Sequence, residues 1–270
     1  MVVQHNLTAM NANRQLGVTT SAQAKSTEKL SSGYRINRAS DDAAGLSISE
    51  KMRSQIRGLD QASSNAQDGV SLIQTAEGAL NEAHSILQRM NELAVKAAND
   101  TNQSIDRTAI QDEITALTSE ISRIATTTQF NKQDLLDGSF SAKMLQVGAN
   151  AGQNISITIG AMDASTLGVD ALAVSSYGAA STAIGLIQSA INQVSSQRSA
   201  LGALQNRLEH TIANLDTTAE NTQAAESRIR DVDMASEMVE YSKNSILAQA
   251  GQSMLAQANQ STQGVLSLLQ

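Results

Sequence analysis

The feature that most constrains this sequence is an apolar repeat that continues from Ile48 to Ala97. Its steps average about 3.5 residues, which is the spacing of a coiled coil. Proline, the residue that interrupts helices, is absent from all 270 residues. We therefore expect one unbroken helix of roughly 75 Å over this stretch. The repeat consists of Ile48, Met52, Ile56, Leu59, Ala62, Ala66, Val70, Ile73, Ala76, Leu80, Ala83, Leu87, Met90, Ala94 and Ala97.

Polar residues mark both ends of this helix. Asp41 and Asp42 precede it, where carboxylates can cap and complement a helix start. The polar run 99–102 follows it and predicts a loop. A second apolar stripe predicts a helix from about Ile105 to Ala125, which should fold back on the first.

A third long helix is expected from about Ser181, returning along the first. Its stripe contains Ile184, Ile187, Ile191, Val194, Leu201, Leu204, Leu208, Ile212 and Leu215, with an interruption at Arg198. Only the stripe at 48–97 is long enough to cover it, so the two should pack antiparallel.

The middle of the chain loses the helical period. Residues 155–159 alternate apolar and polar side chains, as a half-buried strand does. Together with residues 145–147 and the glycine-containing turn between them, they predict a β-hairpin. Residues 160–178 are rich in Gly, Ala and Ser and are interpreted as a connector that tolerates insertions.

Composition favours thin interfaces between helices over a thick globular interior. Aromatic residues make up only 2% of the chain, and tryptophan is absent. The predicted fold class is therefore mainly α: an elongated antiparallel helical bundle or coiled coil with a small β-hairpin region at about 140–160.

The two ends of the chain are weakly amphipathic. Residues 1–40 carry few large apolar side chains, and Thr20, Gln23 and Thr27 occupy positions where a coiled coil needs apolar ones. Near the other end, Leu247, Ala250, Met254 and Ala258 form a small apolar stripe, and residues 265–270 are mostly apolar. Such ends should be ordered by assembly with other copies rather than by folding within one chain. The alternative is that they are frayed termini without a role.

Several classes of function are disfavoured. The net charge of −7 argues against nucleic-acid binding, because neutralising phosphates needs a basic face. The chain has no cysteine, and His5, His84 and His210 belong to no metal-binding spacing. No nucleophile, phosphate or dinucleotide motif occurs, so neither an enzyme nor a cofactor is expected. The sequence contains no membrane-spanning run and no signal peptide, which by these rules alone indicates a cytoplasmic protein.

Two further groups of residues allow two interpretations, and a third allows one. Arg35 and Arg38 beside Asp41 and Asp42 could clamp a phosphate, but a loop held by ion pairs is commoner. The second group, Met234, Met238 and Met254, could line a promiscuous groove or simply fill irregular helix contacts. The third, Arg89 and Glu92, has the pattern of ordinary solvated helix residues.

Two long stretches near each end resemble the signatures of bacterial flagellins. At the N-terminal side these are 28–46 (Glu28-Lys29-Leu30-Ser31-Ser32-Gly33-Tyr34-Arg35-Ile36-Asn37-Arg38-Ala39-Ser40-Asp41-Asp42-Ala43-Ala44-Gly45-Leu46) and 67–80. At the C-terminal side they are 225–235 and 249–259. The resemblance covers about residues 1–140 and 185–270. Asn131-Lys132, where Asn-Gly is usual, and the final Gln270, where Arg is frequent, depart from the family pattern.

The resemblance implies a minimal flagellin without outer domains. Residues 1–41 with 231–270 would form a terminal coiled-coil region that lines the inner tube of the filament, and residues 42–230 a rod-shaped helical domain. The implied function is a structural subunit that self-assembles into the flagellar filament for motility. This replaces the cytoplasmic interpretation with secretion, because the family is exported unfolded through the flagellar type III apparatus.

The resemblance also implies partners. These are other flagellin subunits, an export chaperone that holds about residues 230–270, the export apparatus, and the filament cap and junction proteins; membrane insertion is not expected. The polymerisation and chaperone-binding residues are expected to be Leu7, Met10, Leu16, Leu247, Met254, Leu255, Leu266 and Leu269.

A receptor is implied as well. The family motif for Toll-like receptor 5 is present as Gln88-Arg89-Met90-Asn91-Glu92-Leu93, and its acidic partner matches Glu113. Gln88, Arg89, Glu92, Leu93 and Glu113 are therefore the expected receptor-binding residues, with arginine and leucine as plausible hot spots. The alternatives to a filament subunit are a hook-filament junction protein, an adhesin or immune ligand, and an enzyme carried on this scaffold.

Overall fold

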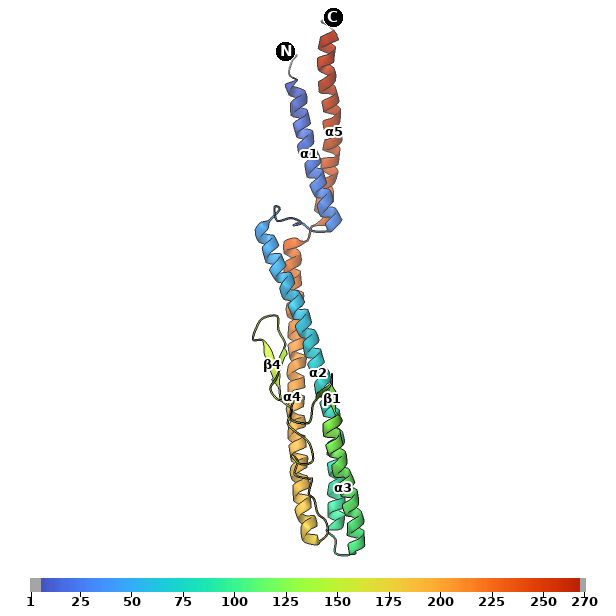
Figure 1. The fold of residues 1–270 in the computed structure, drawn as a ribbon. Helices are drawn as coiled ribbons and strands as arrows, with labels where there is room; N and C mark the ends of the chain where they lie inside the picture. Colours follow the sequence, from blue (N-terminus) through green and yellow to red (C-terminus); the bar gives the residue numbers. More distant parts are fainter. Residues whose placement is uncertain (1–5, 268–270) are drawn as a thin grey trace. The chain divides into compact units, whose positions relative to one another are not determined.

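The computed structural model describes residues 6–267, and the side chains of residues 6–261. Its helices are α1 (Leu7–Ser32), α2 (Ala43–Ala97), α3 (Ser104–Thr127), α4 (Tyr177–Arg230) and α5 (Met234–Ser267) (Figure 1). Its strands are β1 (Gln129–Phe130), β2 (Gln133–Asp134), β3 (Lys143–Gln146) and β4 (Asn154–Ile157). The predicted fold class, a mainly α antiparallel bundle with a small β region, is confirmed.

The chain divides into two compact units. Residues 55–219 form the larger unit, and the residues up to Ser54 together with those from Glu220 form the smaller one. Helices α2 and α4 are continuous and contribute to both units. The boundaries proposed from the resemblance, at 41/42 and 230/231, stay a prediction.

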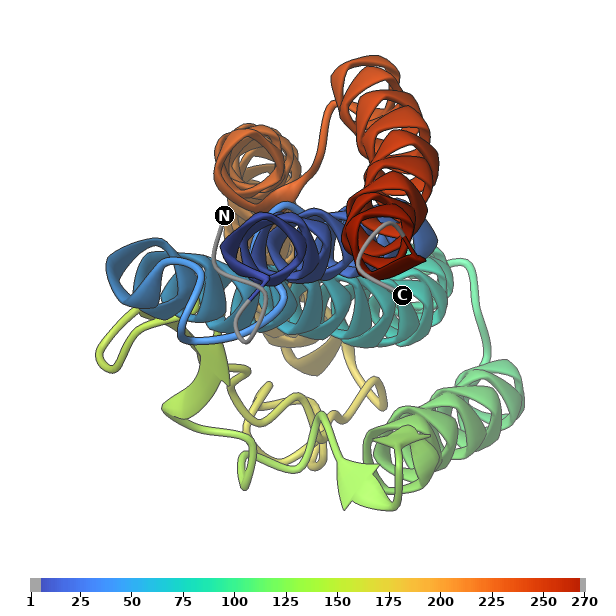
Figure 2. The same cartoon turned by 90° about the horizontal axis from the view of Figure 1, so that it is seen from above.

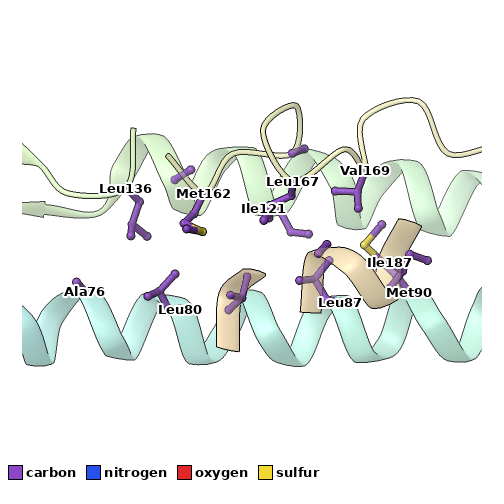
Figure 3. Close-up of a cluster of buried hydrophobic side chains, with 14 of the residues drawn as sticks. Ala76, Leu80, Leu87, Met90, Ile121, Leu136, Met162, Leu167, Val169 and Ile187 are labelled. Atoms are coloured by element: carbon purple, nitrogen blue, oxygen red, sulfur yellow. The ribbon is translucent and has the colours of Figure 1, made fainter. Parts of the chain in front are cut away.

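The larger unit is built on the predicted repeats. Its core joins Leu80, Leu87 and Met90 of α2 with Ile121 of α3 and Ile187 of α4, all of them buried (Figure 3). Helix α4 begins at Tyr177, earlier than predicted. At the predicted interruption, Arg198 Nη2 lies 3.6 Å from Glu77 Oε1 of α2, so a half-buried ion pair replaces the apolar contact there.

The segment interpreted as a connector is instead a packed layer. Met162, Leu167 and Val169 point into the core between the helices (Figure 3). The Gln111 side chain of α3 holds this segment at two points: it donates to the Leu172 carbonyl at 2.8 Å and accepts from Val174 N–H at 2.8 Å. The apolar residues of this segment follow no regular period, which is why the sequence pattern did not reveal their burial.

The predicted hairpin is confirmed as β3 paired antiparallel with β4, with Leu145 opposite Ile155. The hairpin packs on α2 at two positions where the helix residue is glycine and has no side chain. A Cβ at Gly69 would lie 2.5 Å from Leu145 Cδ2, and one at Gly58 would lie 2.9 Å from Ala149 Cβ. These two glycines therefore allow a sheet to lie against a helix whose other side packs on α4.

A second hairpin, β1–β2, was not predicted. Gln129 pairs with Asp134 and Phe130 with Gln133, which leaves Asn131 and Lys132 as a two-residue turn. Both turn residues have positive φ, 50° and 62°. This is the pattern of a type I′ turn, in which glycine is the preferred second residue.

Replacing Lys132 with glycine should stabilise the protein. A non-glycine residue in the left-handed region costs about 1–3 kcal/mol, and the extra freedom of glycine in the unfolded chain offsets about 0.5–1 kcal/mol. We expect Lys132→Gly to raise the free energy of unfolding by about 1 kcal/mol in urea denaturation. The control Lys143→Gly, in a strand with negative φ, should lower it. An unchanged or lower stability of Lys132→Gly would contradict the turn assignment.

Candidate functional site

In the smaller unit, α1 and α5 form an antiparallel pair (Figure 1 and Figure 2). Lys29 Nζ lies 3.3 Å from Glu237 Oε2 at one end of the pair. Asn6 Nδ2 donates to the Ala258 carbonyl at 3.0 Å near the other end. Between them Gly251 approaches Leu16 so closely that an added Cβ would lie 3.3 Å from Leu16 Cδ1.

The seam between these two helices is made mainly of small and polar side chains. Among the described side chains of the pair, only Ser26 (4% exposed) and Asn244 (7%) are buried. The half-buried seam positions recur every three or four residues, as in a coiled coil. They include Ala9, Ala12, Leu16, Thr19 and Gln23 on α1 and Glu237, Tyr241, Ala248, Gly251, Leu255 and Ala258 on α5.

Most of the large apolar side chains of the pair face outward instead. Met10 is 64% exposed, and Met254 is 63% exposed. Leu7, Val18, Met234, Met238, Val239, Ile246 and Leu247 are exposed as well. From Asn244 onward the sequence contains no charged side chain. Exposed apolar area of this kind marks an interaction surface.

The predicted assembly residues are thereby separated into two groups. Leu7, Met10, Leu247 and Met254 lie on the outward faces, whereas Leu16 and Leu255 are half-buried in the seam. The side chain of Leu266 and all of Leu269 lie outside the described residues. Met234, Met238 and Met254 are about half exposed or more, so they do not fill contacts between the described helices of one chain, and their role in helix contacts or a groove stays a prediction.

A short connection joins this pair to α2 and α4 within the smaller unit. Gly33 ends α1 with φ of 76°, and Tyr34 bridges to Asp231. The Arg230 guanidinium lies 4.8 Å from the centre of the Tyr34 ring, and its Nη1 is 2.9 Å from Glu50 Oε1. Sequence reasoning missed this anchor, although Tyr34 and Arg230 both lie in the signature stretches.

The loop before α2 is held by ion pairs, as the commoner interpretation supposed, but with different partners. Asp42 Oδ1 caps α2 by accepting from Gly45 N–H at 2.8 Å. Asp41 accepts from the backbone N–H groups of Asn37 and Arg38 and lies 2.8 Å from Lys25 Nζ. Arg38 pairs with Glu28 at 2.8 Å. Arg35 donates to the Ile229 carbonyl, so these residues form a structural loop rather than a phosphate clamp.

This arrangement lowers the pKa of Asp41 to about 2, chiefly through the hydrogen bond from Lys25 and then through the backbone N–H of Arg38. A depressed carboxyl pKa stabilises the fold above its ordinary value of 3.8, and this contribution is lost as pH falls toward about 2. NMR titration should therefore show Asp41 ionised at pH 3.

In Lys25→Met the pKa of Asp41 should return toward its ordinary value, whereas Lys51→Met, the loss of another lysine of the same unit, should leave it depressed. An Asp41 that titrates at its ordinary value in the unaltered protein would refute the ion pair.

A second candidate site is a charged groove between α2 and α3. Arg89 Nη2 lies 2.9 Å from Glu113 Oε1, and Arg89 Nη1 lies 3.2 Å from Glu92 Oε2. The groove has a volume of about 620 Å³ and is also lined by Leu93, Lys96, Asn102, Asp106, Ala109 and Ile110. Arg89 is thus presented in a fixed orientation by two carboxylates, with donors still open to solvent.

The other two predicted receptor residues differ in exposure. Gln88 is exposed, and its amide nitrogen lies 3.0 Å from His84 Nε2. Leu93 is only 3% exposed and belongs to the hydrophobic core. Leu93 therefore supports the floor of the groove and is not an exposed anchor.

Other kinds of site are not found in the described part of the chain. Within residues 6–267 no group of His, Asp and Glu side chains could hold a metal ion. A search of the same residues finds no helix that is long and apolar enough to span a bilayer.

Comparisons with known proteins agree with these features. Residues 3–141 match the family model described as the bacterial flagellin N-terminal helical region, and residues 184–269 match the bacterial flagellin C-terminal helical region. A flagellin of Halalkalibacterium halodurans is 58% identical, and one of Bacillus subtilis is 54% identical; each alignment covers 100% of both chains. The crystal structure of Bacillus cereus flagellin matches with a TM-score of 0.51 and 32% identity, covering 60% of this chain and 94% of that one.

Proposed function

The chain belongs to the bacterial flagellin family, and from that premise we propose that the outward faces of α1 and α5 are the surface through which it polymerises. As a flagellin it is a structural subunit of the extracellular flagellar filament and not an enzyme. It is of the minimal type, because only residues 142–183 separate the two matched regions. Part of that short segment forms β3–β4 and part packs on the core, which leaves no outer domain.

One observation carries the polymerisation proposal: the α1–α5 pair has most of its large apolar side chains outside and mainly small and polar ones inside. A pair of this kind gains little from its own seam, because hydrophobic stabilisation scales with the apolar area removed from water. Most of that area becomes buried only when other copies cover the outward faces. Polymerisation then supplies the stability that the pair lacks in a free subunit.

Seeded elongation tests this surface. Burying a leucine or methionine side chain contributes about 1.5–3 kcal/mol, so Leu247→Gln and Met254→Gln should each raise the critical concentration about tenfold or more. Ser253→Gln, an exposed polar position on the same helix, is the matched control and should change it little. Urea unfolding of the larger unit should be the same in all three variants, because none of these residues belongs to it.

Electron microscopy of a fragment of residues 42–230 provides a second check. Because it lacks α1 and α5, the fragment should stay monomeric and should not add to filament seeds that the full chain extends. If Leu247→Gln and Met254→Gln elongate as well as the unaltered protein, these faces are not the polymerisation surface.

We further propose that α5 is covered before secretion. Its exposed Val239, Ile246 and Leu247 would promote aggregation inside the cell, so an export chaperone binds about residues 230–270. The N-terminal region directs the unfolded chain into the flagellar type III apparatus without cleavage. Cap and junction proteins contact the same outward faces at the two ends of the filament. Reduced co-purification of the Leu247→Gln chain with the chaperone would support this overlap.

The Arg89 groove is proposed as the contact for Toll-like receptor 5. A guanidinium held between Glu92 and Glu113 keeps a fixed direction, so less side-chain freedom is lost on binding. The same face is covered in the filament, so the free subunit is the form that is recognised. The buried Leu93 acts by holding α2 against α3 beneath the groove.

Receptor binding by free subunits should fall at least tenfold in Arg89→Ala, the magnitude typical of an arginine hot spot. Arg123→Ala is the matched control, because Arg123 is a similarly exposed arginine that pairs with Glu120 on α3. It should leave binding unchanged in surface plasmon resonance with the receptor ectodomain. Equal losses in both variants would indicate a general charge effect instead of a specific site.

A hook-filament junction protein remains the structural alternative. It is disfavoured because the chain is 58% and 54% identical, over the full length of both chains, to proteins called flagellins. Quantifying the chain in sheared filaments separates the two roles: a filament subunit is the main component, whereas a junction protein is a minor one.

A further inference from the structure

The outward faces of α1 and α5 carry four exposed methionines. Met10 and Met254 are the most exposed of them, and Met234 and Met238 are each about half exposed. By contrast, Met90 and Met162 are buried in the core of the larger unit. The thioether sulfurs of a free subunit are thus concentrated on the surface that the proposed function buries.

This chain has no cysteine to react with an oxidant first. Methionine is then the side chain that peroxides oxidise most readily, and oxidation follows solvent exposure. Each event is a two-electron oxygen transfer: hydrogen peroxide oxidises the sulfide to a sulfoxide and is itself reduced to water. No further reductant or proton donor is required.

We propose that Met10, Met234, Met238 and Met254 form an oxidation-sensitive set that decides whether a free subunit can join a filament. The inference rests on the proposed polymerisation surface. Its modification is methionine sulfoxide, its oxidant is hydrogen peroxide, and its consequence is exclusion of the damaged subunit from assembly.

The physical reason is the change in polarity. A sulfoxide oxygen is a strong hydrogen-bond acceptor, and burying it without a donor is unfavourable. Of the four helix positions three or four residues from Met254, Ala250, Gly251 and Ala258 have no side-chain donor, and only Gln257 has one. Subunits already in the filament have these sulfurs covered, so the discrimination acts before assembly.

A competition experiment tests the proposal without any substitution. Free subunits are treated with hydrogen peroxide until about half of each exposed methionine is oxidised, and are then added to filament seeds. Peptide mass spectrometry compares the sulfoxide content of the sedimented filaments with that of the subunits left in solution. Sulfoxide at Met10 and Met254 should be at least tenfold depleted in the filaments.

Met144 provides the internal control. It is 66% exposed but belongs to β3 of the larger unit and not to α1 or α5. Its sulfoxide should be distributed equally between filaments and solution. If sulfoxide at Met10, Met234, Met238 and Met254 were also distributed equally between filaments and solution, the oxidation proposal would be wrong. The proposed polymerisation function would still stand in that case, because the subunits would still have formed filaments.

A substituted chain gives the second measurement. Leucine has about the volume of methionine but no sulfur to oxidise, so the chain with Met10, Met234, Met238 and Met254 all changed to leucine should elongate after peroxide treatment at the same rate as the same chain untreated. Met144→Leu should remain sensitive to peroxide. Treatment of oxidised unaltered protein with methionine sulfoxide reductases A and B should restore elongation. Loss of elongation by the oxidised leucine chain, or no loss by the oxidised unaltered chain, would refute the assignment.

Discussion

The placement of small side chains determines how closely the long helices of this protein approach one another. Alanine and glycine at regular steps let long helices approach closely along their full length. In the larger unit Ala66, Ala76, Ala83, Ala94 and Ala97 alternate with Leu80, Leu87 and Met90, so small residues leave space that large ones fill. In the seam of α1 and α5 nearly all positions are small or polar, so close approach is kept but little apolar area is buried. The first arrangement buries a large apolar core within one chain, whereas the second buries little apolar area there.

The regular parts of this architecture could be predicted because helices and strands impose fixed periods on a sequence. The repeat at 48–97 identified α2 to within a few residues, and alternation at 155–159 identified the β3–β4 hairpin. The β1–β2 hairpin escaped because Asn131-Lys132 lacks the glycine that usually marks such a turn. The packed segment around Met162 and Val169 escaped because irregular backbone has no period to recognise.

The candidate sites were predictable to a different degree. Pattern alone indicated that the ends are insufficiently stable, but it placed the Leu247, Ala250 and Met254 stripe without saying which way it faces. The structure turns these three residues outward, but it puts Ala258, the fourth residue of the predicted stripe, against α1 together with Asn244, Ala248, Gly251 and Leu255. The contacts of Arg230 with Tyr34 and Glu50 join residues far apart in the chain. Contacts of this kind depend on tertiary structure and leave no local signal.

The absence of charged side chains from Asn244 onward has a consequence for a protein that assembles with copies of itself. In a helical assembly every subunit has the same surroundings, so a charge on a shared surface recurs at each subunit and meets its own copies at fixed spacing. Identical charges in such a row would repel one another along the whole length of the assembly, and salt would be needed to screen this repulsion. Neutral amide and hydroxyl side chains can repeat without that accumulation, because each can donate to one neighbour and accept from another.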